Sequence, residues 1–423
     1  MAVRRVRYAP AMHRRLIGSA LVVAACATLG AARPGQGPQQ PPRFTSAVNM
    51  LAVDVRVVDR NGEPILGLLP EDFTVSINRH QRRVVSASLV HFGSTSAPLV
   101  NIEQPLAKTP GRIPDDSRVF VIAIDASSFS TGGITPAVNA AQRFVDNLRP
   151  SDMVGVYVFP YERPAVDVTH DRRAVRDALD HVIGRREDRH GQYRLSPSEM
   201  MDINNGDREA LQRVVDAECK KPLDALADLG CPGIVSAEAS MAAAYYESEA
   251  AQRMYGLGLL LHDLGRVPGR KTVVVVSGGL LSSPRAGGRP DVHGFMVRLG
   301  EQAARSNVGT YVLHLDDTFL DTFSASRPPS LRVANQNRAA IADEFANASG
   351  LERLATETGG TYLSIKAGNG DLAFGRVLRE TMAYYLLGVE PSVEDSDGRK
   401  LVVQVSTRAK GAIVRALREV IAK

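Results

Sequence analysis

The stretch RVFVIAIDASSFS, residues 118–130, decides the fold, because a continuous apolar run leads directly into an acid and several hydroxyl groups. Residues 119–124 are all apolar, which is typical of a strand covered on both faces in a parallel sheet. Asp125 stands at the carboxyl end of this strand, where open α/β sheets bind ligands. The hydroxyl groups that follow belong to Ser127, Ser128 and Ser130. Their oxygens, with the carboxylate, are of the kind that Mg²⁺ prefers, so the stretch predicts a ligand site at the sheet edge.

Strands and helices alternate along the chain after this stretch. Apolar runs predict strands, and apolar residues at helical spacing predict helices between them. The expected strands are 152–159, 271–276, 309–315 and 361–365, and the expected helices are 136–148, 171–183, 236–264, 295–306 and 338–358. This order predicts an α/β fold with a doubly wound, mainly parallel sheet over residues 117–370. The polar residues 184–232 interrupt the alternation, and we expect them to be an insertion that shapes partner choice.

Short strands are predicted at both ends of the chain outside this sheet. Alternating apolar residues indicate strands in the segment 47–92, which is too small for confident independent stability. Two more strands, 384–389 and 401–407, fall in the extension 371–423 and flank a polar turn. We expect the N- and C-terminal strands to form one small β module, with residues 93–116, which carry four prolines, as a linker.

The first 32 residues have the features of a secretory signal peptide: five arginines, no acidic residue, and then a short apolar core. Cleavage would fall near Ala31 or Ala32 and leave residues 33–46 as a flexible tether. Val23-Ala24-Ala25-Cys26 also resembles a bacterial lipobox, in which Cys26 would carry a lipid anchor. An uncleaved anchor helix is a third interpretation. All of these interpretations predict export to the periplasm, the envelope or the medium.

Charge and cysteine content narrow the classes of partner. Five of the 51 lysines and arginines lie in residues 1–32, so the rest of the chain has as many basic residues as acidic ones, 46 of each. A balanced chain without a basic stripe argues against nucleic-acid binding. Apart from Cys26, the cysteines are Cys219 and Cys231. In an exported chain they are a candidate disulfide, and two unlinked thiols are the alternative.

Several segments together resemble von Willebrand factor type A (VWA) domain proteins, and in particular the bacterial exported "VWFA-related" family. Asp125-Ala-Ser127 resembles the start of the Asp-x-Ser-x-Ser pattern of the metal-ion-dependent adhesion site in VWA domains. LERLATETGGTYL, residues 351–363, resembles their closing helix, turn and strand. Residues 53–85, VDVRVVDRNGEPILGLLPEDFTVSINRHQRRVV, and 384–408, YYLLGVEPSVEDSDGRKLVVQVSTR, resemble the terminal segments of the exported family.

The resemblance implies a divalent cation at Asp125 and Ser127, but the rest of the ligand set is missing. Phe129 replaces the second serine, and Gly278 stands where the family often has an aspartate. So few oxygen ligands predict a degenerate site, with no cofactor expected and Mg²⁺ as the alternative. The candidate residues for contact with a partner protein are Ser128, Ser130, Ser277 and Gly278.

These features predict a protein-binding or scaffolding module whose partner lies in the envelope or outside the cell. The alternatives are a metal-dependent adhesion protein with an unconventional site and an envelope-anchored lipoprotein. An enzyme is the remaining alternative, but the sequence has no nucleophile elbow, zinc-protease motif or phosphate-binding loop. We therefore predict no catalytic residues.

Overall fold

The computed structural model describes residues 50–92, 117–161, 165–187, 191–219, 230–315, 336–365, 370–395, 400–416 and 419–421 of the 423-residue chain. The predicted signal peptide, tether and linker, and with them Cys26, lie outside the described residues. Among the described helices, none combines the length and the hydrophobicity needed to cross a membrane.

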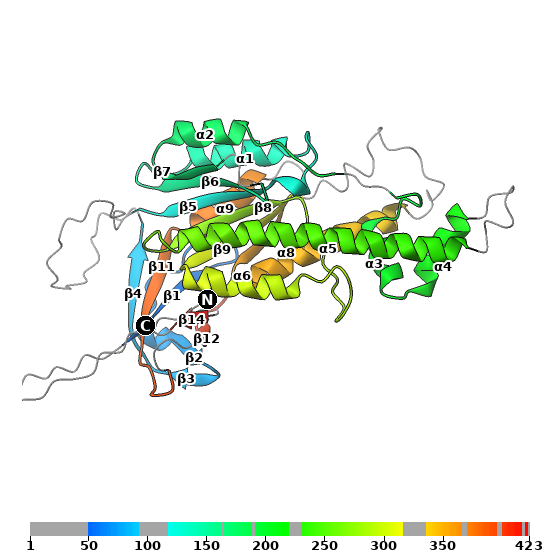
Figure 1. The fold of residues 1–423 in the computed structure, drawn as a ribbon. Helices are drawn as coiled ribbons and strands as arrows, with labels where there is room; N and C mark the ends of the chain where they lie inside the picture. Colours follow the sequence, from blue (N-terminus) through cyan, green and yellow to red (C-terminus); the bar gives the residue numbers. More distant parts are fainter. Residues whose placement is uncertain are drawn as a thin grey trace, which may run out of the picture. The chain divides into compact units, whose positions relative to one another are not determined.

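A six-stranded sheet has the order β10-β9-β8-β5-β6-β7. Figure 1 labels its strands from β5 to β9. Its strands are β5 (Val119–Asp125), β6 (Met153–Phe159), β7 (Ala165–Thr169), β8 (Lys271–Ser277), β9 (Val308–Leu315) and β10 (Thr361–Ile365). All pairs are parallel except β6 with β7. Every residue of β5 and β8 is buried, as their continuous apolar runs predict for inner strands. The mainly parallel sheet is confirmed, whereas the edge strand β7 was not predicted.

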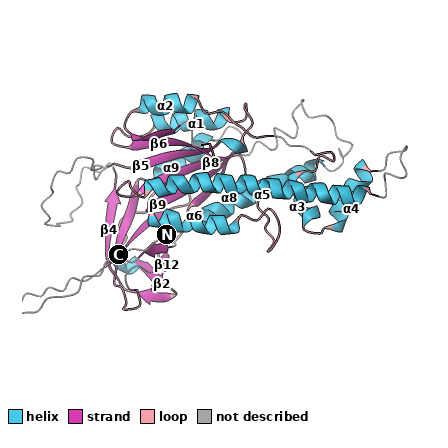
Figure 2. Ribbon diagram, viewed as in Figure 1, coloured by secondary structure: helices cyan, strands magenta, loops and turns pink. Residues whose placement is uncertain are grey.

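Helices cover both faces of this sheet (Figure 2). One face carries α1 (Thr135–Asp146), α2 (Arg172–Asp180) and α9 (Gly370–Glu380), and the other carries α5 (Cys231–Leu264), α6 (His293–Arg305) and α8 (Gln336–Glu357). Successive residues of a strand point to opposite faces. Phe120 and Ile122 of β5 accordingly enter one core, and Val121 and Ala123 enter the other. Because both faces are buried, the sheet is doubly wound.

The strand order reverses between β5 and β8. From β5 the chain passes through α1 to β6 on one side, and it later returns through α5 to β8 on the other side of β5. The loops that follow β5 and β8 therefore leave in opposite directions, which opens the position where such sheets bind ligands. Asp125 ends β5 and Ser277 ends β8, so both residues lie at this switch point.

Two four-stranded sheets form the β module. One has the order β13-β1-β11-β4 and the other β14-β12-β2-β3. The strands of the first are β1 (Leu51–Val58), β4 (Val84–His91), β11 (Ala383–Val389) and β13 (Ile413–Ala416), and those of the second are β2 (Phe73–Ile77), β3 (His80–Arg82), β12 (Lys400–Thr407) and β14 (Glu419–Ile421). Both sheets contribute to one apolar core, so the module is a β-sandwich.

The predicted pairing between the N-terminal and C-terminal strands is present in both sheets of this sandwich. Leu51 of β1 lies opposite Val389 of β11, and Ile77 of β2 lies opposite Val403 of β12. The two C-terminal strands do not form a hairpin, because β11 belongs to one sheet and β12 to the other. A hairpin alone would bury little apolar surface, whereas the sandwich buries the inner faces of β1, β2, β11 and β12.

Residues 184–232 contain helices that a polar sequence did not reveal, α3 (Pro197–Asn204) and α4 (Arg208–Glu218). Ser196 caps α3 with its hydroxyl and Asp207 caps α4 with its carboxylate. The first half of α5 packs against both helices over a small core that includes Tyr193, Val214 and Val235. Cys219 and Cys231 form a disulfide with Cα atoms 6.1 Å apart, which joins the end of α4 to the start of α5.

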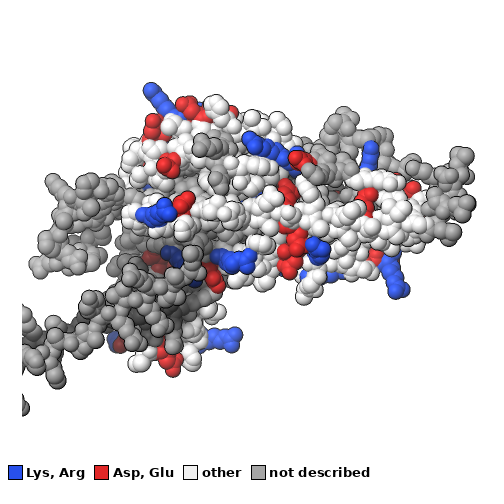
Figure 3. All heavy atoms as spheres, viewed as in Figure 1, with Lys and Arg blue, Asp and Glu red and all other residues white. Residues whose placement is uncertain are grey.

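Acidic and basic side chains are interspersed on the face of the molecule that Figure 3 shows. No wide area of a single sign of charge is visible on that face. This distribution agrees with the balanced composition outside residues 1–32.

Candidate functional site

The candidate site lies at the carboxyl ends of β5 and β8, where Asp125 is 2% exposed. The short 3-10 helix η2 (Ala126–Ser128) follows β5 directly and turns the chain away from the sheet. A buried carboxylate is costly unless a charge or hydrogen-bond donors compensate it. The neighbours of Asp125 therefore decide what this site can bind.

Arg253 of α5 compensates Asp125 directly. Its Nε lies 2.9 Å from Asp125 Oδ2 and 3.1 Å from Oδ1, and its Nη2 also bonds to Oδ2. The Arg253 side chain is 8% exposed. The pair is thus a buried, charge-assisted contact with two guanidinium nitrogens, the strong form of this interaction. The Arg253 guanidinium thus lies beside the carboxylate at which the resemblance to VWA domains implies a divalent cation.

Hydroxyl and carbonyl groups complete the shell around this pair. Ser277 donates to Asp125 Oδ2 at 2.8 Å, and Ser127 donates to Asp125 Oδ1 at 3.1 Å. Arg253 Nη2 also lies 3.2 Å from Ser277 Oγ and bonds to the carbonyl of Gly279. Both carboxylate oxygens therefore have donors, and both already bond to the Arg253 guanidinium.

Packing explains why the other ligands of an adhesion site are missing. Phe129 is fully buried in the apolar core under α1, so no hydroxyl is needed at its position. A Cβ on Gly278 would stand 2.6 Å from the carbonyl oxygen of Ser128, closer than real Cβ atoms come. An aspartate does not fit there. The described residues also contain no group of three or more His, Cys, Asp and Glu side chains able to hold a metal ion.

The buried side chain of Ser128 connects the loop that follows β5 with the loop that follows β8. Its hydroxyl donates to the Asp125 carbonyl at 2.7 Å and accepts from the Gly278 amide at 2.8 Å. Ser128, Ser277 and Gly278 are all buried, so these candidate contact residues support the site instead of forming its surface. Ser130 is the one of the four that is partly exposed, and its hydroxyl accepts from the Gly133 amide at 3.2 Å.

The start of the insertion packs against the loop that follows β5. Arg185 donates its amide to the Ala126 carbonyl at 2.8 Å, and Arg186 does the same to Phe129. A Cβ on Gly184 would stand 2.1 Å from the Ser130 carbonyl oxygen, so this close approach requires glycine. The insertion is thereby fixed at the edge of the candidate site.

Tyr161 and Arg185 form the exposed rim beside this loop. The Arg185 guanidinium carbon lies 4.7 Å from the centre of the Tyr161 ring, a cation–π contact. The Tyr161 side chain is 44% exposed. Its pKa is raised, first by partial burial and then by the nearby charge of Glu249, with a smaller effect from Asp125. Tyrosine and arginine are the residue types that most often anchor protein interfaces.

Sequence reasoning missed Arg253 and Tyr161. Arg253 lies on the buried stripe of α5, three residues after Ala250 and four before Leu257. An arginine on an apolar helix face was the available signal, because a charge there needs a partner. The partner, Asp125, is 128 residues away in the chain, so spacing could not identify it.

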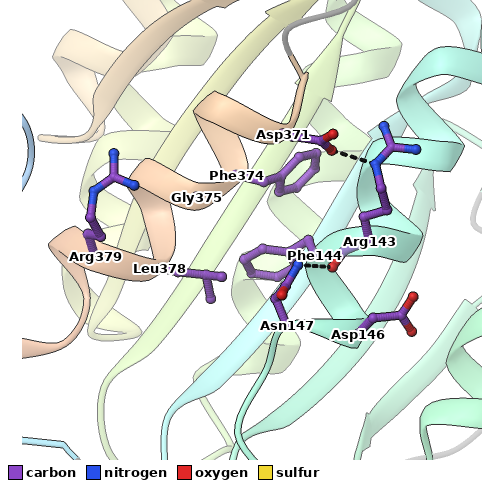
Figure 4. A pocket seen from close by; sticks show the side chains of 9 residues that line it. All are labelled: Arg143, Phe144, Asp146, Asn147, Asp371, Phe374, Gly375, Leu378 and Arg379. Carbon is purple, nitrogen blue, oxygen red and sulfur yellow. Dashed lines mark hydrogen bonds and ion pairs between the residues drawn. The ribbon is translucent and has the colours of Figure 1, made fainter.

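A groove of about 550 Å³ lies between α1 and α9 (Figure 4). Phe144 and Phe374 line its apolar part with ring centres 5.0 Å apart. Arg143 Nε bonds to Asp371 Oδ1 at 2.6 Å across it, and both side chains are about half exposed. The groove lies at the carboxyl end of α1, whereas the candidate site precedes the start of that helix. The charged side chains Arg143 and Asp371 of the groove pair with each other, and the groove contributes no residue to the candidate site around Asp125.

No protein family and no curated protein matches this sequence. A search of solved structures finds the VWA domain of SpRpn10, with 10% identity, a TM-score of 0.27, and coverage of 63% of this chain and 96% of that one. It also finds the human COPII-coat protein Sec24c, with 9% identity, a TM-score of 0.26, and coverage of 72% and 43%. Likenesses this low do not assign a family.

Proposed function

We propose that this chain is an exported, non-catalytic binding module of the VWA type that engages a partner protein without a divalent cation. The observation that carries the proposal is the buried Arg253–Asp125 pair at the switch point of the sheet. Ligands of doubly wound sheets bind at this position, and Asp125-x-Ser127 stands there in the way the resemblance to VWA domains implies.

Charge explains the independence from metal. A divalent cation beside Asp125 would meet the guanidinium of Arg253, whose nitrogens already bond to both carboxylate oxygens. Binding would require Arg253 to leave a buried position in which it also bonds to the Gly279 carbonyl. Removing a buried arginine from its partners costs several kcal/mol. The same pairing leaves Asp125 unsuited to act as a base or nucleophile, which supports a binding role.

The proposed contact surface is the rim of this site, formed by Tyr161, Arg185 and the partly exposed Ser130. The loop that follows β5 supports these residues. Ser128 bonds this loop to Gly278 after β8, and Gly184 packs closely against the Ser130 carbonyl. A rigid loop loses little conformational entropy when a partner binds. Helices α3 and α4 of the insertion, which pack against the first half of α5, offer further surface for partner choice.

Export is supported by the sequence of residues 1–32 and by the disulfide between Cys219 and Cys231. Disulfides persist mainly in oxidising compartments such as the periplasm and the extracellular space. The proposal covers a periplasmic, a secreted and an envelope-associated protein. Lipidation at Cys26 remains part of the proposal as an alternative to cleavage near Ala31, and mass analysis of the mature N-terminus distinguishes them.

Capture of partners from envelope and medium fractions tests the function. We expect the same specific partner in Mg²⁺ and in EDTA, and at least a tenfold loss of affinity for Tyr161→Ala combined with Arg185→Ala. Tyr255→Ala with Arg289→Ala is the matched control, since Tyr255 is 68% exposed and lies two residues from Arg253, on the opposite side of α5. Calorimetric titration with Mg²⁺ or Mn²⁺ should show no saturable heat. Partner binding that EDTA abolishes would contradict the proposal.

A further inference from the structure

A small cavity lies at the opposite end of the same strands, where β5 and β8 begin and the β-sandwich adjoins the sheet. Its volume is about 20 Å³. By this measure a cavity needs about 10–15 Å³ to hold one water molecule, so there is room for a single ligand of about that size, such as one small monatomic ion. Three arginines line it: Arg56 from β1, Arg118 before β5, and Arg270 before β8.

The arginines bring more positive charge to this region than the contacting carboxylates neutralise. Arg56 and Arg118 are 5% and 6% exposed. Arg118 bonds to Asp152, but Arg149 uses the same carboxylate, with its Nη2 2.9 Å from Oδ1. Among the described residues, Arg56 is linked to Glu380 through the Tyr311 hydroxyl, at 2.6 Å and then 3.0 Å. Glu380 also pairs with Arg376 at 2.7 Å, so these carboxylates are shared.

Arg270 is the least compensated of the three. Its Nε and Nη1 are shielded from solvent and have no hydrogen-bond partner among the described residues. Asp54 Oδ2 lies 3.4 Å from Nη1, a distance for an ion pair but without hydrogen-bond geometry. Burial lowers the pKa of Arg270 to about 10, and repulsion from Arg56 contributes to the shift. Buried donors without an acceptor cost free energy, and an anion in the cavity would remove that cost.

We propose that this cavity binds one small monovalent anion of halide size, such as chloride, held by Arg270 and Arg56. Arg118 supplies charge but no free donor, because its nitrogens already bond to Asp152, Thr381 and the Leu378 carbonyl. Sulfate or phosphate exceeds the volume of the cavity. A water molecule fits but leaves the charge excess unchanged. The site is distinct from the Asp125 site and does not depend on the proposed function.

Thermal unfolding of the full-length chain at constant ionic strength tests the site. Chloride and bromide should raise the melting temperature by about 3 °C relative to gluconate, with saturation, as ligand binding to the folded state requires. Sulfate should give no saturable rise. Arg270→Gln should remove the difference between chloride and gluconate. Arg289→Gln, which changes an exposed arginine paired with Glu247, should retain it.

Crystals grown in bromide locate the ion without any variant. An anomalous peak in the cavity within about 3.5 Å of Arg270 Nε would support the site. Equal melting temperatures in chloride and gluconate, or bromide peaks confined to the surface as adventitious ions only, would overturn it. If Arg270→Gln fails to fold, the wild-type titration and the anomalous map still decide the question.

Discussion

Buried charges are balanced at one end of the central strands β5 and β8 and are in excess at the other. At the carboxyl ends of β5 and β8, Asp125 and Arg253 neutralise each other, and each carboxylate oxygen has donors. At the amino ends, Arg56, Arg118 and Arg270 line a cavity. The carboxylates of Asp152 and Glu380 nearby also pair with further arginines, and the donors Nε and Nη1 of Arg270 have no hydrogen-bond partner among the described residues. A buried ionic centre whose charges balance has no group left for a ligand, whereas one with an excess of charge can bind an ion of the opposite sign.

Breaking the balanced centre should give the largest effect. Arg253→Ala leaves Asp125 buried without its cation, and we expect a loss of about 3–5 kcal/mol in the free energy of unfolding. The variant also frees the oxygen atoms of Asp125 and Ser277 that bond to the guanidinium, and such oxygen atoms suit a divalent cation. Mg²⁺ or Mn²⁺ should therefore raise the melting temperature of the variant but not that of the wild type.

Arg289→Ala is the control for this experiment, since Arg289 is about half exposed and pairs with Glu247 at the surface. It should change stability by less than about 1 kcal/mol and should not respond to divalent cations. A wild-type response to Mg²⁺ as large as that of Arg253→Ala would show that the guanidinium does not occupy the metal position.

Placing at position 278 the aspartate that VWA domains often have there should not create a metal site. In Gly278→Asp the new Cβ would stand 2.6 Å from the Ser128 carbonyl oxygen and 3.2 Å from the Phe129 ring. We expect a loss of about 1–3 kcal/mol from overpacking and no gain of Mg²⁺ affinity, measured by chemical denaturation and calorimetry. Gly132→Asp is the matched control, because no atom lies within 4 Å of its Cβ position. Saturable Mg²⁺ binding by a folded Gly278→Asp variant would refute this account.

The sequence predicted those parts of the fold that local patterns encode. Residues 119–124 and 271–276 are continuously apolar, and burial on both faces is the physical reason for that pattern. The pairing of residues 51–92 with 384–407 followed from the fact that neither segment could bury its apolar residues alone. The position of Asp125 at a sheet edge likewise followed from the strand that precedes it.

The missed features depend on contacts between distant residues. Arg253 of α5 supplies the positive charge of the candidate site, and no sequence pattern near Asp125 indicates that it does. The arginines of the cavity come from β1 and from the segments before β5 and β8, which only the fold brings together. The two-sheet arrangement of β11 and β12 was hidden for the same reason, since adjacent strands in sequence suggest a hairpin.

Reducing the positive charge at the amino ends should give the smallest effect, and in the stabilising direction. Lys271 begins β8, is 2% exposed, and donates to the Val267 carbonyl at 2.8 Å. Burial lowers its pKa from 10.5 to about 8, so the folded protein disfavours the charged form. Below pH 8 the Lys271 ammonium is charged in both the folded and the unfolded protein, and the folded protein is destabilised by the full free energy of burying that charge. Between pH 8 and 10.5 only the unfolded state remains protonated, so wild-type stability should rise with pH.

Lys271→Met removes this charge and should stabilise the protein by about 1 kcal/mol at pH 7, because the lost bond to Val267 offsets part of the gain. The advantage over the wild type should shrink as pH increases from 8 to 10.5, as measured by urea denaturation. Lys410→Met, at an exposed position, should show no such pH dependence. If the difference in unfolding free energy between Lys271→Met and the wild type stayed constant across this range, the charged form of Lys271 would not be destabilising. The excess of positive charge at this end of the sheet would then come from the arginines alone.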